Sequence, residues 1–229
     1  MRIRLTAALV AASLFLVGCT TPPQRSLPLR SEALASKPKM GVAMSLLPKV
    51  DTAFPGAECL LCLAAASMAN RSLTAHVQTL SGDDLKQVRD DLAERLRAKG
   101  LDVIVIEEPI DLTKLREVSP VQMNFARRDF SPLKEKHRID KLVVIDISAW
   151  GVERTYSAYV PTSAPKAIVR GTSYIVDLTS NALDWYMSVW VRKAAGPDWD
   201  EPPKFPGLTN AFYQAIEQGK DAVLQPFEQ

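Results

Sequence analysis

The chain has 229 residues, and 47% of them are hydrophobic, which is enough to form the core of one large domain. Of its 28 Lys and Arg, Arg2 and Arg4 lie in a leader without acidic residues, and the rest equal the 26 Asp and Glu in number. After the leader there is therefore no net charge to attract nucleic acid or an anionic surface, and we expect no nucleic-acid partner.

The first residues predict export. Arg2 and Arg4 precede an apolar segment, Leu5–Phe15, that is too short to span a membrane and has the length of a signal-peptide core. It is followed by Leu16-Val17-Gly18-Cys19, which resembles the lipobox of bacterial envelope lipoproteins. The resemblance implies that residues 1–18 are a lipoprotein signal peptide and that Cys19 carries acyl chains such as palmitate. A plain signal peptide or membrane anchor with a chance cysteine is the alternative.

The residue after Cys19 is Thr20 and not Asp. By resemblance to enterobacterial sorting signals, this favours the outer membrane over the inner one. The chain has no second long apolar run, so we expect acyl chains alone to hold it to the membrane, on the periplasmic face.

The chain after the anchor divides into a tether and a domain. Residues 20–38 contain four prolines and no sustained hydrophobic period. We therefore expect a flexible tether at residues 19–39 and a single globular α/β domain at residues 40–229.

The first half of the domain predicts helices and strands in alternation. A strand at 40–47 precedes a small apolar helix or turn within 56–70. Apolar residues at helical spacing predict a helix over 83–99, and a β-branched strand follows at 101–106. A helix over 125–137, divided at Pro132, leads to the most apolar strand, 141–147, which we expect to be central and buried.

The second half predicts antiparallel strands. Segments 155–160, 167–178 and 184–193 are rich in β-forming residues, and a tight turn at Asn181 joins the last two. An amphipathic helix over 208–224 closes the chain. The predicted fold class is α/β (α+β): a mixed sheet with helices packed on it, an antiparallel C-terminal hairpin and a closing helix.

Three parts of this pattern carry a resemblance: the helix and strand of 92–106, the strand 141–147, and the hairpin 174–185 with Trp185. Together they resemble the TolB amino-terminal domain, a fold also found in the curli secretion lipoprotein and in lipoproteins that activate peptidoglycan synthases. The lipobox and residues 153–227 also resemble an uncharacterised family of proteobacterial envelope lipoproteins. The resemblance implies architecture and location, and it carries no catalytic motif.

Cys59 and Cys62 form a C-x-x-C pair. The compartment is oxidising, and we expect the apolar residues around the pair to bury the sulfur atoms, so the pair is expected to be a structural disulfide or two buried free thiols. A redox centre and a metal site are the alternatives. No second cysteine pair is present to complete a zinc site, and the chain has only two histidines, so we expect no metal.

The sequence contains no recognisable catalytic set. There is no Gly-x-Ser-x-Gly motif, no glycine-rich phosphate loop and no metal-binding histidine spacing. His76 is expected at a helix surface or packed against a neighbour. The scattered carboxylates, Asp146 among them, are expected to cap helices or form ion pairs. We expect no catalytic residue, no cofactor and no enzymatic activity.

The segment around residues 150–160 is the candidate partner surface. It places Trp150, Arg154, Tyr156 and Tyr159 near the end of a strand, and aromatic and arginine side chains are enriched at binding hot spots. The alternative is that these rings cover the sheet as a minor core.

These observations predict a non-enzymatic lipoprotein that docks an envelope protein or a second copy of itself. The first alternative is a periplasmic redox protein that uses Cys59 and Cys62. The second is a subunit of a secretion pore, which requires amphipathic strands that the continuous apolar run at 143–145 does not provide.

Overall fold

The computed structural model describes residues 23–228 apart from 197 and 202–203, so the signal peptide and Cys19 lie outside the described residues. The elements, in chain order, are α2 (Glu32–Ala35), β1 (Met40–Ser45), β2 (Asp51–Ala53), α3 (Leu60–Ala69), α4 (Arg71–Val77), α5 (Asp83–Ala98), β3 (Val103–Ile110), η1 (Leu112–Lys114), α6 (Pro132–His137), β4 (Lys141–Glu153), β5 (Tyr156–Ser157), β6 (Val160–Pro161), β7 (Lys166–Asp177), β8 (Leu183–Ala194), α7 (Pro206–Leu224) and η2 (Gln225–Phe227).

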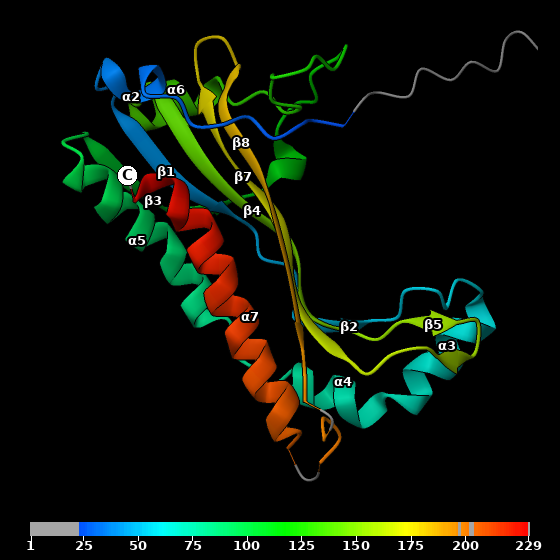
Figure 1. The fold of residues 1–229 in the computed structure, drawn as a ribbon. Helices are drawn as coiled ribbons and strands as arrows, with labels where there is room; N and C mark the ends of the chain where they lie inside the picture. Colours follow the sequence, from blue (N-terminus) through cyan, green and yellow to red (C-terminus); the bar gives the residue numbers. More distant parts are fainter. Residues whose placement is uncertain (1–22, 197, 202–203, 229) are drawn as a thin grey trace, which may run out of the picture.

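A mixed sheet of six strands organises the body (Figure 1). Its order is β3-β1-β4-β7-β8, and β2 pairs with the far end of β4. Strand β1 runs parallel to β3 and β4, whereas β4, β7 and β8 form an antiparallel meander. The predicted fold class, a mixed sheet with helices packed on it and a closing helix, is confirmed.

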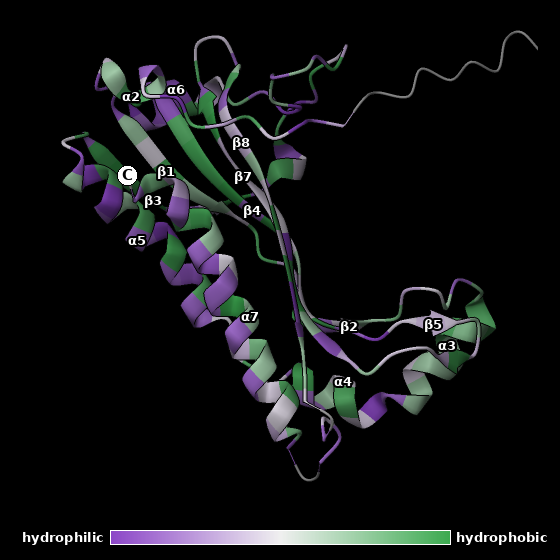
Figure 2. Cartoon of the chain, in the orientation of Figure 1, coloured by the Kyte–Doolittle hydropathy of each residue, from purple (hydrophilic) through white to green (hydrophobic). Residues whose placement is uncertain are grey.

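Helices α5 and α7 lie side by side over one face of the sheet (Figure 1). Alternate residues of β4, among them Val143 and Ile145, pack with Leu92 of α5 and Phe212 of α7. The residues between them, among them Val144, point to the other face, so β4 is central and apolar on both sides. The hydropathy colouring shows both helices as amphipathic, with hydrophilic residues outward (Figure 2).

The second face is covered by α6, by the loop that precedes it and by the N-terminal segment. Phe130 and Ile139 pack there on Leu142 and Val144. Of the helix expected at 125–137, only α6 is helical. It begins at Pro132, which fits the first turn of a helix because that position needs no N–H donor.

The segment 23–39, expected to be a flexible tether, lies against the body. Leu27 and Tyr186 of β8 exchange backbone hydrogen bonds of 2.8 and 3.0 Å, as in an antiparallel bridge. Leu29 and Leu34 pack on the edge of the core. The proline content suggested a tether, but leucines without a regular period are enough to dock the segment.

Beyond the body, β2, α3, α4, β5 and β6 form a projecting arm, residues 51–77 and 154–163 (Figure 1). The strand expected at 155–160 is replaced by the short β5–β6 hairpin, because β4 runs on to Glu153. Gly151 has a φ of 130°, and a Cβ there would collide with the Asp51 backbone. Glycine thus lets β4 and β2 approach closely at the base of the arm.

Candidate interaction surface on the arm

The arm is held together by a small cluster of its own. Ala57, Cys62, Ala66 and Tyr156 are buried there, with Phe54 partly buried against them. The Phe54 and Tyr156 rings meet edge to face at 5.8 Å. Gly56 has a φ of 89°, and a Cβ at this position would collide with the Tyr156 carbonyl. The loop before α3 and the β5–β6 hairpin are therefore packed directly on each other.

A buried polar network fixes α3 to the hairpin. Asn70 is 2% exposed and donates from Nδ2 to the Tyr156 hydroxyl at 2.6 Å and to the Ala66 carbonyl at 2.7 Å. Arg154 donates to Asn70 Oδ1 at 2.9 Å, and its guanidinium lies 5.0 Å from the Trp199 ring centroid. Arg154 and Tyr156 thus hold the arm in shape and do not form a free surface.

Trp150 belongs to the body. Its indole N–H donates to the Pro48 carbonyl at 2.7 Å, and its ring packs beside Phe212 at 6.0 Å. The expectation that Trp150 and Tyr156 form a partner surface is therefore wrong, because both side chains are buried in cores, as in the alternative. Of the four candidate residues only Tyr159 is strongly exposed.

The exposed surface of the arm is instead helix α3. Leu60, Leu61, Leu63 and Met68, here called the α3 apolar surface, are 88%, 73%, 45% and 79% exposed. Only Cys62 and Ala66 of this helix are buried. The apolar residues that we expected to enclose the sulfur atoms point to solvent, because the arm is too thin to cover more than one side of the helix.

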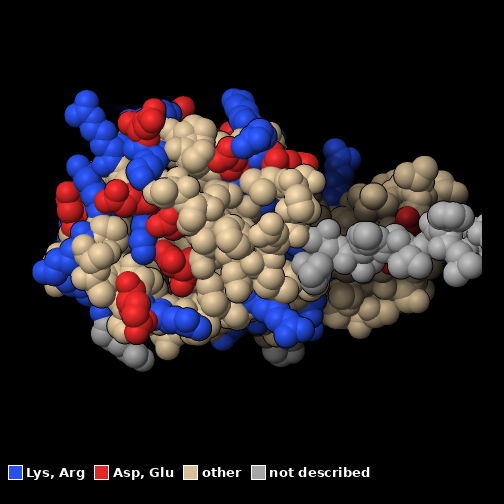
Figure 3. All heavy atoms as spheres, turned by 90° about the horizontal axis from the view of Figure 1, so that it is seen from above, with Lys and Arg blue, Asp and Glu red and all other residues tan. Residues whose placement is uncertain are grey.

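The arm also has very few charges. Glu58 is the only charged residue from Thr52 to Asn70. Helix α3 stands out as hydrophobic at the end of the arm (Figure 2), and the face shown in Figure 3 has its charged side chains mainly on the body. Tyr159 and Val160 of the hairpin, both exposed, extend the apolar character of this end.

Cys59 and Cys62 are joined in a disulfide, with their Cα atoms 4.9 Å apart. Cys59 is the N-cap of α3, and its sulfur accepts the Cys62 N–H at 2.9 Å. Cys59 is exposed and Cys62 is buried. The Tyr159 hydroxyl lies 3.7 Å from the Cys59 sulfur. Among the described residues, no three His, Cys, Asp or Glu side chains are grouped so that they could hold a metal ion.

His76 of α4 packs against the start of α7. Its Nε2 lies 2.8 Å from Thr209 Oγ1, and its ring lies 5.3 Å from that of Phe205. Burial, and secondarily the positive charge of Lys204, lowers the pKa of His76, so the ring is neutral at pH 7. His76 is thus packed against neighbouring residues, which is one of the two environments expected from the sequence.

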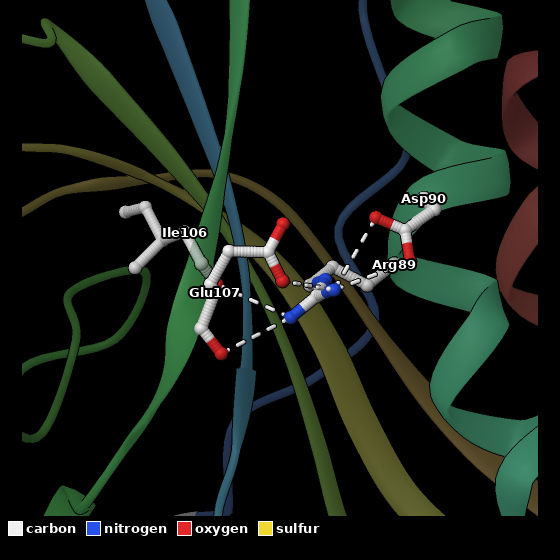
Figure 4. A network of polar contacts seen from close by, with 4 residues as sticks. All are labelled: Arg89, Asp90, Ile106 and Glu107. Carbon is white, nitrogen blue, oxygen red and sulfur yellow. Dashed lines mark hydrogen bonds and ion pairs between the residues drawn. The ribbon is translucent and has the colours of Figure 1, made fainter.

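A polar network on the body has a structural role. Arg89 of α5 bonds to the Glu107 carboxylate at 2.8 Å and to the carbonyls of Ile106 and Glu107, and it pairs with Asp90 at 3.2 Å (Figure 4). It ties α5 to the edge strand β3. These contacts join a helix to a strand, so we assign the network no chemistry.

No helix within the described part of the chain combines the length and the apolar character needed to cross a membrane.

No family model matches the chain, and no curated protein matches it. Solved structures align with it at low identity. PelC from Paraburkholderia phytofirmans, a dodecamer, is 12% identical, over 91% of this chain and 94% of that chain, with a TM-score of 0.32. Protein XCC0632 from Xanthomonas campestris is 13% identical, over 89% and 90%, with a TM-score of 0.40.

Lipoprotein GNA1162 from Neisseria meningitidis is 11% identical, over 79% of this chain and 96% of that chain, with a TM-score of 0.28. All three TM-scores are below 0.5, so we infer neither the function of this chain nor finer details of its fold from these proteins. The likeness to the TolB amino-terminal domain stays a prediction from the sequence.

Proposed function

We propose that this protein is a non-enzymatic lipoprotein, anchored through Cys19 to the periplasmic face of the outer membrane, that docks another envelope protein through the α3 apolar surface. The observation that carries the proposal is an uncharged, apolar helix held exposed at the end of a projecting arm. The lipobox-like residues before Cys19 support the anchor.

The exposure of α3 is energetically unusual. Burying one leucine side chain stabilises a protein by about 1.5–3 kcal/mol. Four exposed apolar side chains on one short helix therefore leave a large amount of free energy to be gained when a partner covers them. Contiguous apolar patches on a monomer mark interaction sites. An apolar helix that enters a groove on a partner is a recurrent recognition mode.

The helix is also rigid before any partner arrives. The Asn70–Tyr156 hydrogen bond at its end fixes it to the β5–β6 hairpin, and the disulfide closes its own first turn. A preorganised element loses little conformational entropy on binding, which favours affinity.

The composition of α3 favours a protein partner over the lipid surface. Helices that lie in a membrane interface have a charged face rich in Lys and Arg, which interacts with the headgroups. From Thr52 to Asn70 the chain has neither Lys nor Arg. The apolar groove of a protein needs no such charges.

The test is capture of the partner from crosslinked cells with the full chain carrying Leu61→Glu. A charge on this surface should abolish recovery of a specific envelope protein, or of a second copy, that the wild-type chain recovers reproducibly. The matched control is Leu46→Glu, since Leu46 is an equally apolar residue, 54% exposed, outside the arm. Undiminished capture by Leu61→Glu, or no reproducible partner of the wild-type chain, would refute the proposal.

One observation favours thiol–disulfide exchange as a second candidate function. The exposed Cys59 sulfur stands at the N-terminus of α3, where the helix dipole favours a thiolate. A substrate thiolate would attack Cys59, and Cys62 would leave as a thiolate. A second substrate thiol would then release Cys59, so that the substrate dithiol is oxidised and the Cys59–Cys62 disulfide is reduced.

Titration of the reduced chain with an alkylating reagent separates the two functions. A Cys59 thiol that reacts rapidly at pH 6, together with oxidation of a dithiol peptide, would support exchange. Docking predicts instead that a Cys59→Ser, Cys62→Ser double variant still captures the partner, once its helix content is shown to be unchanged.

A further inference from the structure

The second face of the sheet contains a cavity of about 550 Å³, on the body and away from α3. Strands β4, β7 and β8 form its floor. Its walls come from Leu112, from the loop around Phe125 and Phe130, and from Pro23 and Gln24 of the N-terminal segment. A concave space of this size is typical of small-molecule sites in proteins.

The floor consists of two rows of side chains that cross the strands. Asp146 of β4 stands opposite Thr172 of β7, which stands opposite Ser188 of β8. Residues opposite each other on neighbouring antiparallel strands point to the same face, so these three form one polar row. The Ser45 hydroxyl of β1 continues the row and donates to Asp146 Oδ1 at 2.7 Å.

The next row is aromatic. Tyr174 stands opposite Val144 on one side and opposite Tyr186 on the other. The two tyrosine rings stack at 6.0 Å, and Phe130 meets Tyr174 edge to face at 6.1 Å. The cavity therefore presents aromatic surface beside a carboxylate.

Asp146 has no positively charged partner among the described residues. It is half-buried, and the Ser45 hydroxyl is its one side-chain hydrogen bond within that part of the chain. An unpaired carboxylate on the wall of a cavity is costly, because burial removes part of its hydration and no cation compensates for the loss. The expectation that the scattered carboxylates only cap helices or form ion pairs does not hold for this residue.

Tyr174 adds a second polar group without a partner. It is 8% exposed and lines the cavity, and within the described residues its hydroxyl has no hydrogen bond to another side chain. Burial, together with the nearby Asp146 carboxylate and Tyr186, raises the pKa of Tyr174, so the hydroxyl stays protonated and can donate to a ligand.

Arg127 and Arg128 line the wall of the cavity, and within the described residues neither forms an ion pair with Asp146. Arg128 pairs with Glu117 at 2.9 Å and donates to the Leu115 carbonyl at 3.2 Å. Arg127 is exposed to solvent. The charge left on the floor is thus negative, and the surfaces next to it are aromatic.

We propose that this cavity binds a small organic ammonium compound, with its charged nitrogen at Asp146 and its apolar or aromatic body against Tyr174 and Tyr186. The carboxylate supplies the opposite charge, and aromatic faces attract cations within about 6 Å of the ring. A hydrocarbon chain fits less well, because it would cover the polar row of Asp146, Thr172 and Ser188 without satisfying it. A metal ion would lack further strong ligands, since no three His, Cys, Asp or Glu side chains are grouped together within the described residues.

The test is ligand-observed NMR titration of the full chain in detergent at pH 7, with 2-phenylethylamine as probe and protein-free micelles as blank. The alcohol 2-phenylethanol and the acid 3-phenylpropanoate are analogues of similar size without the positive charge. The amine should bind saturably and at least tenfold more tightly than either analogue.

Two variants and one control locate the site. Asp146→Asn should weaken amine binding at least tenfold and remove the preference over the alcohol. Ser188→Trp, at an exposed position on the cavity floor, should block the amine by filling the space. Asp221→Asn, an exposed carboxylate of α7 on the other face of the sheet, should bind the amine like the wild-type chain.

Three results would overturn the inference: no saturable amine binding up to millimolar concentration, equal affinity for the amine and the alcohol, or full affinity of folded Asp146→Asn. If circular dichroism shows that Asp146→Asn does not fold, the decision passes to Ser188→Trp. Unchanged amine binding by that variant would place the amine outside this cavity.

Discussion

Asn70 and Tyr156, 86 residues apart in the sequence, are joined by a hydrogen bond of 2.6 Å inside the arm. Asn70 ends α3 and Tyr156 begins the β5–β6 hairpin, so this bond connects the two halves of the arm. Its partners are buried, and the geometry of the α3 apolar surface therefore depends on it.

Tyr156→Phe should loosen the arm without unfolding the body. Removing the hydroxyl takes away one acceptor from the buried Asn70 amide, and such a loss costs about 1–2 kcal/mol. Amide hydrogen exchange of α3 and α4 should speed up accordingly, while the exchange of β4 and β7 stays unchanged.

The control is Tyr159→Phe, which removes a hydroxyl from an exposed tyrosine on the same hairpin. Its exchange rates should match those of the wild-type chain. Equal rates in both variants would mean that the Asn70–Tyr156 bond does not stabilise the arm.

Val144→Asp should unfold the domain. Val144 is completely buried in the central strand, and a carboxylate there has no partner to compensate for its lost hydration, which costs upwards of about 3 kcal/mol. Thermal unfolding followed by circular dichroism measures the effect. Ser148→Asp, at an exposed position of the same strand, should unfold close to the wild-type temperature.

The body was predictable because its pattern is local. The apolar run at 142–147 and the helical spacing of Leu85, Val88, Leu92 and Leu96 identify a central strand and its covering helix without knowledge of distant partners. The turn at Asn181, with a φ of 61°, is equally local. The helix lies where the sequence placed it to within one residue, whereas the strand starts as expected but runs six residues further, to Glu153.

The arm was not predictable in the same way. Trp150 and Tyr156 are only six residues apart, but the first packs on Phe212 and the second bonds to Asn70. The burial of each ring thus depends on a partner more than 60 residues away in the sequence. The exposure of helix α3 differs from the expectation for a related reason. Apolar composition predicts burial, but the sequence of a short segment does not show whether another element packs over it.

The cavity had a weak signal in the sequence. Asp146 is the one acidic residue in an otherwise apolar strand segment, and a buried strand does not tolerate a lone charge without a reason. The rest of the site comes from Tyr174, Tyr186 and the loop at 125–130, whose register against β4 only the fold reveals.

Cys19→Ser should remove the acyl acceptor of the proposed anchor. The chain should then remain as an uncleaved precursor or leave the membrane fraction, which cell fractionation with immunoblotting detects. The matched control is Cys59→Ser, which changes another cysteine and should leave anchoring intact. A processed, membrane-bound Cys19→Ser chain would exclude lipidation at this residue.

Asp129 gives a prediction about pH. Its carboxylate accepts hydrogen bonds from the Ser131 hydroxyl at 2.6 Å and from the Arg116 guanidinium at 2.8 Å, and with the Ser131 backbone N–H these lower the pKa of Asp129 from 3.8 to about 2. Because the folded state prefers the ionised form, this stabilisation is complete above the unfolded pKa. It is lost as the pH falls from about 4 towards 2.

Ser131→Ala should therefore raise the pKa of Asp129 towards 3.8, because the largest of the stabilising contacts is gone. NMR titration of the carboxyl carbon in both chains measures this shift directly. The matched control is Thr113→Ala, which removes a hydroxyl that donates to Asp111 in the same way. It should leave the pKa of Asp129 unchanged. If Asp129 titrates at about 2 in Ser131→Ala as well, the ion pair with Arg116 and not the hydroxyl sets its pKa.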